Sequence, residues 1–236
     1  MDFAWSQQQL EQKAAAIAFA KKVLCADVSE HDRNEIFSHD RWKQCAEFGV
    51  LGLSFPESYG GTGADILTTM LIMEGLGYGG KDNGLLFAIN AQMWAVQHPI
   101  LTFGTEVQKA RYLPRLIAGE LIGAHGISEP DSGSDAYSLR TRATQVDGGY
   151  RLSGAKMFVT NAPVADLAIV FASTAPAKGS WGVSAFLIER GTPGFTFGKN
   201  IEKMGLRTAP MGELILQDCF VPEENRLGPK KSRETA

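Results

Sequence analysis

The chain has 236 residues, which is enough for two domains that each bury a core. Hydrophobic residues make up 44% of it and charged residues 21%, values that exclude a disordered or collagen-like chain. The formal net charge is −3, and a sequence without a concentrated basic run is not expected to bind nucleic acid as its main partner.

The cysteines and histidines do not suggest a disulfide framework or a metal site. Cys25, Cys45 and Cys219 are odd in number and far apart. Three histidines, at positions 31, 39 and 98, lack the spacing of metal ligands, so no metal is expected. The amino terminus lacks a signal-peptide pattern, and no window approaches the ~18 apolar residues of a membrane span. We therefore expect a cytoplasmic protein without a membrane segment.

The first half of the sequence has helical periodicity. Ser6 is a suitable N-cap for a helix that runs to Leu24. Gly49 is a suitable C-terminal signal for a second helix over 40–48, and a loop rich in Gly and Pro follows at 55–63. Further helices are predicted over 64–76, over 82–103 with a disturbance at Pro99, and over 106–117. Residues 1–120 are thus expected to form an all-helical N-terminal domain.

The pattern changes near residue 120, where β-branched and alternating runs begin. Gly148-Gly149 has the character of a hairpin turn. Short strands with turn signals and no intervening helices favour an antiparallel sheet or barrel. The expected fold class is α+β, with the helical domain followed by an antiparallel β-barrel-like domain over 121–228 and a polar tail over 229–236. The predicted strands are 121–127, 138–145, 150–160, 167–173, 183–189 and 213–220.

The segment from His125 to Asp135 carries the most functional information. It follows a predicted strand, and its Pro, Gly and Ser residues interrupt the sheet. Such a loop presents backbone N–H groups and short hydroxyl donors together, which suits a polar or anionic ligand. A solvated turn whose side chains cap their own backbone would have the same composition. The residues alone leave both interpretations open.

The motif in this segment resembles a family signature. Ser128-Glu-Pro-x-x-Gly133-Ser134-Asp135 is similar to the [Thr/Ser]-Glu-Pro-x-Ala-Gly-Ser-Asp motif of acyl-CoA dehydrogenases. Other stretches similar to that family occur in the expected order on both sides, and together they cover nearly all of residues 1–228. These stretches are 55–63, 104–120, 154–162, 203–208 and 220–228.

The resemblance implies a bound FAD. Ser128 would bond the pyrimidine end of the flavin ring, and Ser134 would meet the cofactor diphosphate or the thioester arm of the substrate. Phe158 would lie against the isoalloxazine ring, where many members have Trp, although by itself it would be read as an ordinary core aromatic. Glu129 and Asp135 are assigned structural roles. The residues that the resemblance assigns to the cofactor are His125, Gly126, Ile127, Ser128, Gly133, Ser134, Phe158, Val159 and Thr160, the last of them near flavin N5.

The resemblance also implies a reaction, the FAD-dependent α,β-dehydrogenation of an acyl thioester. Family members remove the α-proton with a carboxylate from a C-terminal four-helix domain, and nothing after Gly228 resembles that domain. No catalytic residue is therefore assigned, and the chain by itself is expected to be inactive. It is either a fragment of a longer dehydrogenase or a short homologue that works with a partner or as a binding module.

The carrier of the acyl group is a further expectation from the resemblance. Segments 82–88, 161–166 and 221–228 look closer to the branch that oxidises acyl or prolyl groups on carrier proteins than to the fatty-acid branch. Both CoA and a carrier protein stay open as partners. Because the family's C-terminal domain contributes across a subunit interface, a homo-oligomer is expected.

Overall fold

The computed structural model describes residues 4–136 and 138–228, so the predicted polar tail lies outside the described residues. The described chain folds into two compact units. The first takes in 4–90, Ile117–Glu120 and Lys203–Ala209. The second takes in Ala91–Leu116, Leu121–Glu202 and 210–228. Each unit is therefore built from stretches that are separate in the sequence.

The first helices follow the predicted caps. Ser6 accepts a hydrogen bond from the backbone N–H of Gln9, whose side chain in turn accepts from the Ser6 N–H, which completes a capping box. Gly49, with φ +90°, follows α3 in the left-handed conformation that favours glycine. A short helix over residues 28–33 was not predicted. The helices and helical turns up to residue 79 are α1 (Gln7–Val23), α2 (Val28–Arg33), α3 (His39–Glu47), η1 (Val50–Gly52), η2 (Glu57–Tyr59) and α4 (Ile66–Gly79).

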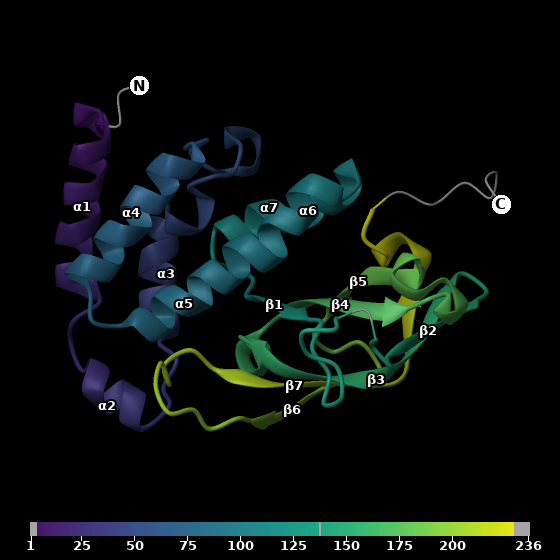
Figure 1. Ribbon diagram of the computed structural model, residues 1–236. Coiled ribbons are helices and arrows are strands. Elements are labelled where there is room, and N and C mark those ends of the chain that lie inside the picture. Colours follow the sequence, from purple (N-terminus) through teal and green to yellow (C-terminus); the bar gives the residue numbers. More distant parts are fainter. Residues whose placement is uncertain (1–3, 137, 229–236) are drawn as a thin grey trace. The chain divides into compact units, whose positions relative to one another are not determined.

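Helices α1 and α4 pack side by side in the first unit (Figure 1). The approach is close because α4 places glycines against α1. A Cβ on Gly79 would lie 2.5 Å from the Ile17 carbonyl oxygen, and one on Gly75 would lie 3.0 Å from the Lys13 carbonyl oxygen. Any larger side chain at Gly79 would push the two helices apart.

The predicted long helix over 82–103 is interrupted earlier than expected. The chain forms α5 (Asn83–Gln92), a π-helical turn η3 (Met93–Gln97) and α6 (His98–Phe103), in which Pro99 occupies the first turn. Proline is tolerated there because the first N–H groups of a helix lack intrahelical partners. The irregularity thus lies before Pro99. Helix α7 (Glu106–Ile117) has the predicted bounds.

Most of the predicted strands are present. Two strands have the predicted bounds, β4 (Leu167–Ser173) and β5 (Val183–Glu189). The hairpin turn at Gly148 is confirmed, with φ +73° between two antiparallel strands. One strand, β6 (Phe195–Asn200), was missed. The remaining strands are β1 (Gly123–Gly126), β2 (Arg142–Val146), β3 (Gly149–Thr160) and β7 (Met211–Pro222).

The sheet is mixed, so the prediction of a purely antiparallel sheet was wrong. Among the described residues its strand order is β1-β4-β2-β3-β7-β6, and β5 pairs with β4. β1 runs parallel to β4 in the register Gly123↔Leu167 to Gly126↔Val170, and β2 touches β4 in the same sense. The signature loop and the β2–β3 hairpin separate β1 from β4 in sequence, which gives the chain room to return in the same direction.

The core of this sheet is apolar, with one large exception. Leu152, Ala168, Phe186 and Leu214 belong to a continuous buried cluster. Lys156 lies on the same strand as Leu152 and is completely buried. None of the helices in the described part of the chain is long and apolar enough to cross a membrane.

Candidate functional site

Strand β1 brings His125 and Gly126 to the start of the signature loop. The His125 ring is half-buried, and its centroid lies 5.1 Å from that of Phe171 on β4. Burial lowers the pKa of the imidazole, and the nearby Lys156 ammonium lowers it further, so the neutral form prevails at neutral pH. Gly126 is buried, and a Cβ there would lie 2.9 Å from the Leu214 side chain. Gly126 can therefore reach a ligand only through its backbone.

A buried ion pair fixes the loop to β3. The Lys156 ammonium lies 2.6 Å from Glu129 Oε1 and donates to the carbonyl oxygen of Ile127 at 3.2 Å. The Glu129 carboxylate also accepts from the backbone N–H of Arg140 at 2.5 Å and from that of Thr141 at 3.0 Å. The two charged side chains are 0% and 4% exposed. Both ends of the loop are thus tied to one buried carboxylate.

The Glu129–Lys156 interaction offsets the effect of burial on the pKa values of both side chains. Burial by itself would raise the pKa of Glu129, but hydrogen bonds from Lys156, Thr141 and Arg140 hold it below its usual value. Burial lowers the pKa of Lys156, while Glu129 acts in the opposite direction. A charged pair satisfied by this many hydrogen bonds serves as an anchor, and Glu129 has no capacity left to act as a general base. This agrees with the structural role expected for Glu129.

The end of β3 departs from regular strand geometry at Phe158. The pairing of β3 with β7 shifts register between Lys156 and Val159, and Phe158 within this irregularity has φ +56°. A large aromatic residue rarely adopts this left-handed conformation. The Phe158 ring is 59% exposed, whereas Val159 is buried. The irregularity therefore turns an aromatic face outward, a kind of backbone outlier that is common at ligand sites.

The fold brings the two predicted segments together. The backbone N–H of Met157 donates to the carbonyl oxygen of Ser128 at 2.9 Å. Phe158, which is exposed, directly follows the residue that makes this contact with the loop. Ser128 itself is half-buried. An aromatic face, a hydroxyl and loop backbone thus meet where the signature loop joins the end of β3. This combination suits a flat heteroaromatic ligand.

The other predicted residues lie farther along the same two segments. Gly133 and Ser134 are exposed, and a Cβ on Gly133 would have no neighbour within 4 Å. Thr160 is half-buried at the end of β3. Because the Val159 side chain is in the core, it can offer a ligand only its backbone. Asp135 accepts a hydrogen bond from the Ser138 hydroxyl, in line with the turn role predicted for it.

Comparison with known protein families identifies the family to which the chain belongs. Residues 6–120 match the N-terminal domain of acyl-CoA dehydrogenases, and residues 124–219 match their middle domain. The chain belongs to the acyl-CoA dehydrogenase family. The two segments joined at the Met157–Ser128 hydrogen bond both lie in the family's middle domain.

Individual family members are similar over nearly the whole chain. An L-prolyl-[peptidyl-carrier protein] dehydrogenase of Pseudomonas fluorescens is 42% identical over 229 residues, which is 97% of this chain and 60% of that protein. The crystal structure of the prolyl acyl carrier protein oxidase AnaB superimposes with a TM-score of 0.94 at 49% identity, over 96% of this chain and 60% of AnaB. The structure of PigA with FAD and proline gives a TM-score of 0.94 at 40% identity, over 98% of this chain and 60% of PigA.

These coverages have a plain consequence. The 236 residues span about 60% of the length of the relatives that they match.

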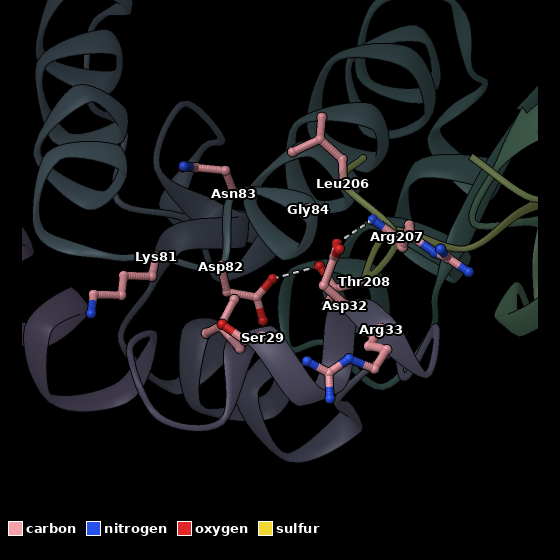
Figure 2. A pocket seen from close by; sticks show the side chains of 11 residues that line it. Ser29, Asp32, Arg33, Lys81, Asp82, Asn83, Gly84, Leu206, Arg207 and Thr208 are labelled. Atoms are coloured by element: carbon pink, nitrogen blue, oxygen red, sulfur yellow. Dashed lines mark hydrogen bonds between the residues drawn. The ribbon is translucent and has the colours of Figure 1, made fainter. Parts of the chain in front are cut away.

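A concave region lies in the first unit. It is a cavity of about 540 Å³ bordered by α2, by the start of α5 and by residues 206–208 (Figure 2). At its wall Asp82 accepts hydrogen bonds from the Thr208 hydroxyl at 2.6 Å and from the Leu85 backbone N–H at 3.0 Å. Asp32 and Asp82 line this cavity together with three basic residues, Arg33, Lys81 and Arg207.

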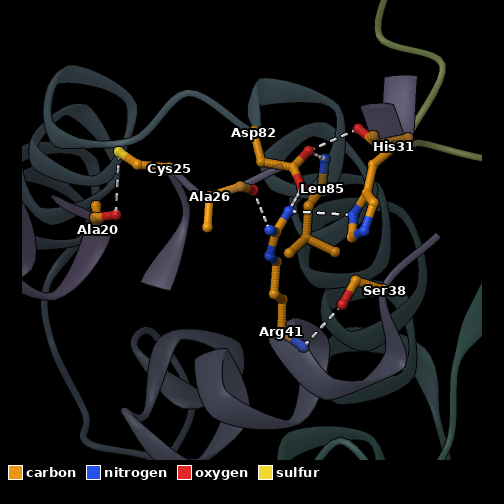
Figure 3. Close-up of polar contacts among 9 residues, drawn as sticks. Ala20, Cys25, Ala26, His31, Ser38, Arg41, Asp82 and Leu85 are labelled. Carbon is orange, nitrogen blue, oxygen red and sulfur yellow. Dashed lines mark hydrogen bonds and ion pairs between the residues drawn. The ribbon is translucent and has the colours of Figure 1, made fainter. Parts of the chain in front are cut away.

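The Asp82 side chain is part of a buried polar network (Figure 3). Arg41 donates to Asp82 at 3.1 Å and to the Ala26 carbonyl oxygen, and it lies 3.3 Å from the Nδ1 atom of His31. Arg41 and Asp82 are 8% and 1% exposed. The network ties α2, α3 and α5 together, so its charged groups serve the fold of the first unit. The described residues contain no group of three His, Cys, Asp or Glu side chains arranged to hold a metal ion.

Proposed function

We propose that these residues form the flavin-binding part of an FAD-dependent dehydrogenase that oxidises an acyl thioester between its α and β carbons. Membership of the acyl-CoA dehydrogenase family supports the reaction class. The similarity to PigA, a protein solved with FAD and proline, supports the cofactor.

The observation that carries this proposal is the junction between the signature loop and β3. The Met157–Ser128 hydrogen bond and the Glu129–Lys156 ion pair hold the two segments together without using the exposed Phe158 ring. An exposed aromatic residue in a left-handed conformation has a cost of about 1–3 kcal/mol that nothing in an ordinary strand requires. A ligand that stacks on the ring provides a reason to keep it.

The residues at this junction fit the ring of FAD. When bound, FAD supplies the acceptor for a hydride from the β carbon of the thioester. Phe158 offers the ring a flat face, Ser128 offers a hydroxyl, and His125, Gly126 and Ile127 offer backbone groups. We assign Gly133 and Ser134 to the cofactor diphosphate or the thioester arm, and Val159 and Thr160 to the backbone and hydroxyl contacts beside Phe158.

The substrate class follows from the relatives. The names of the Pseudomonas fluorescens relative and of AnaB favour a prolyl or other acyl group on a carrier protein as the substrate. An acyl-CoA is the alternative substrate. We also propose two domains, 1–120 and 121–228, a division that the family matches to 6–120 and 124–219 support. On the basis of the family resemblance, we further propose that the protein forms a homo-oligomer. We also propose that it is located in the cytoplasm.

The proposal predicts that the purified chain binds FAD through Phe158. Saturating FAD should raise the midpoint of thermal unfolding, since a ligand at 100 times its Kd stabilises a protein by about 2.7 kcal/mol. Phe158→Gly should leave the free protein folded, because glycine adopts φ +56° without strain, yet it should weaken FAD binding by up to about tenfold. Phe158→Trp should retain binding. Differential scanning fluorimetry with an FAD titration measures both quantities.

A matched control comes from the same sheet. Phe220 on β7 is 37% exposed and lies outside the two motif segments, so Phe220→Gly should leave the FAD-dependent shift unchanged. The absence of any FAD-dependent shift in the parent chain would contradict the proposal. It would favour the second reading, a homologue that acts as a binding module.

A further inference from the structure

We propose that the cavity bordered by α2, the start of α5 and residues 206–208 binds a phosphorylated small molecule of nucleotide size. The inference goes beyond the proposed function, because none of the residues that we assign to the flavin lines this cavity. All of its lining residues belong to the first unit, whereas the two motif segments belong to the second.

Contacts between separate segments hold the wall of the cavity in place. The Asp82 carboxylate accepts from the Thr208 hydroxyl at 2.6 Å (Figure 2). The Asp32 carboxylate accepts from the backbone N–H of Arg207 at 2.8 Å. A Cβ on Gly84 would lie 2.1 Å from the Thr208 hydroxyl oxygen, so the two segments can approach this closely only because residue 84 is glycine. A wall fixed in this way offers a ligand preformed contacts.

The lining has a surplus of one positive charge, because three basic and two acidic side chains border the cavity. The acidic Asp82 is paired with Arg41 at 3.1 Å. The basic Arg207 is paired with Glu35 at 2.6 Å. These two partners, which lie outside the lining, have opposite charges and cancel each other. The surplus therefore remains when they are counted, and it favours an anionic ligand.

Unused hydrogen-bond donors line the same cavity. Arg33 and Lys81 are exposed, and neither forms an ion pair with another of the described residues. Asn83 and Gly84 are the first two residues of α5, and the first N–H groups of a helix have no intrahelical partner. The Nε atom of Arg207 is buried without a hydrogen-bond partner in the described part of the chain, and a buried donor calls for one. A phosphate group, with several acceptor oxygens and a negative charge, matches these donors.

The size of the cavity and its apolar surface favour a phosphate ester over a free phosphate ion. The volume of about 540 Å³ is within the range of small-molecule sites and exceeds what an inorganic ion fills. Val28 and Leu206 give the cavity apolar surface. Leu206 is 45% exposed and has φ +52°, a left-handed conformation that leucine rarely adopts and that is common at ligand sites. The organic part of the ester would lie against these two side chains.

The test is a titration of the purified chain with AMP, adenosine and inorganic phosphate, followed by the backbone amide signals in proton–nitrogen correlation spectra. AMP should shift signals of the lining segments, which are 28–33, 81–84 and 206–208. Arg33→Gln and Lys81→Gln should each weaken AMP binding by about fivefold, because each removes one charged donor near the surface. Both residues are exposed, so the variants should remain folded. Lys22→Gln, at an exposed lysine of α1 in the same unit, should have no effect.

Several outcomes would overturn the inference. The absence of AMP-dependent shifts in the lining segments would do so, as would equal AMP binding by the parent and by the double variant of Arg33→Gln and Lys81→Gln. Adenosine that binds as tightly as AMP would exclude a phosphate site, and inorganic phosphate that binds as tightly would exclude an ester.

FAD contains an AMP unit, so the FAD-dependent thermal shift is measured in the parent and in the same double variant. A shift retained in the double variant, together with weakened AMP binding, supports two separate sites. A shift without AMP binding refutes this inference alone. A shift lost in the double variant would assign the cavity to FAD and would refute the flavin proposal instead.

Discussion

Lys156→Met should lower the free energy of unfolding by about 3–5 kcal/mol, because it leaves the buried Glu129 carboxylate without its counter-charge. Domains of ordinary size are stable by about 5–15 kcal/mol, so a loss of this size removes a large part of the total. It should also release the Ile127 carbonyl oxygen that Lys156 holds, and with it the position of the loop. Urea unfolding followed by circular dichroism measures the loss.

Two further variants separate charge from packing. Lys156→Met combined with Glu129→Gln leaves no buried charge, so the double variant should recover most of the lost stability. Arg151→Met breaks an ion pair of 3.0 Å with Asp218 in which both side chains are well exposed, and it should cost less than about 1 kcal/mol. If Lys156→Met alone is as stable as Arg151→Met, the Glu129–Lys156 pair does not anchor the loop.

The pH dependence of stability should differ between the parent and Lys156→Met. In the parent the pKa of Glu129 lies below its usual value of 4.5, so the stability that this carboxylate contributes is present above pH 4.5 and is lost as the pH falls through the lowered pKa. In Lys156→Met the carboxylate loses its cationic partner, which raises that pKa relative to the parent, while the hydrogen bonds from Thr141 and Arg140 remain. Acidification should therefore narrow the difference in stability between the two proteins.

The 236-residue chain loaded with FAD should not oxidise an acyl thioester at a measurable rate. The acids nearest the candidate site are already engaged: Glu129 by Lys156, Asp131 by Arg140 at 2.7 Å, and Asp135 by the Ser138 hydroxyl. General-base catalysis contributes about 10²–10⁴-fold, and substrate positioning can supply about 7–11 kcal/mol more. Anaerobic stopped-flow absorbance of the oxidised flavin, with a prolyl-carrier or acyl-CoA thioester as the substrate, measures the rate of flavin reduction.

Rapid bleaching of the flavin under these conditions would contradict this expectation. It would require a base among the 236 residues, and Asp135→Asn would be the first variant to examine. Asp135 is exposed, so this substitution leaves the fold intact.

Local signals predicted much of the fold. Ser6 caps α1 and Gly49 ends α3, because capping depends on residues within one turn of the helix end. β4 and β5 have the predicted bounds because each is a short, largely apolar run between turn residues. The parallel pairing of β1 with β4 was missed, since it joins residues more than 40 positions apart, and no local pattern reports strand direction. β6 has only one fully buried residue, Phe195, and its alternation is correspondingly weak.

The candidate site was predicted by resemblance more than by residue chemistry. The motif placed Ser128 and Phe158 in one site, and the structure joins their segments. The anchoring role of Lys156 was missed, since a lysine in a strand is ordinarily assigned to the surface. Its position between the buried Leu152 and Val159 on β3 was the available signal. The positive φ of Phe158 could not be foreseen, because it arises from the register shift against β7.

Hydrogen–deuterium exchange of the 236-residue chain with and without FAD tests the flavin assignment most directly. FAD should slow exchange in peptides that contain residues 125–134 and 156–160, because a ligand that binds the folded state suppresses local opening around its site. The peptides of α1 and α4, which belong to the first unit, should exchange at the same rate in both samples. Unchanged exchange in both middle-domain segments at saturating FAD, or protection confined to the cavity beside Asp82, would contradict the account.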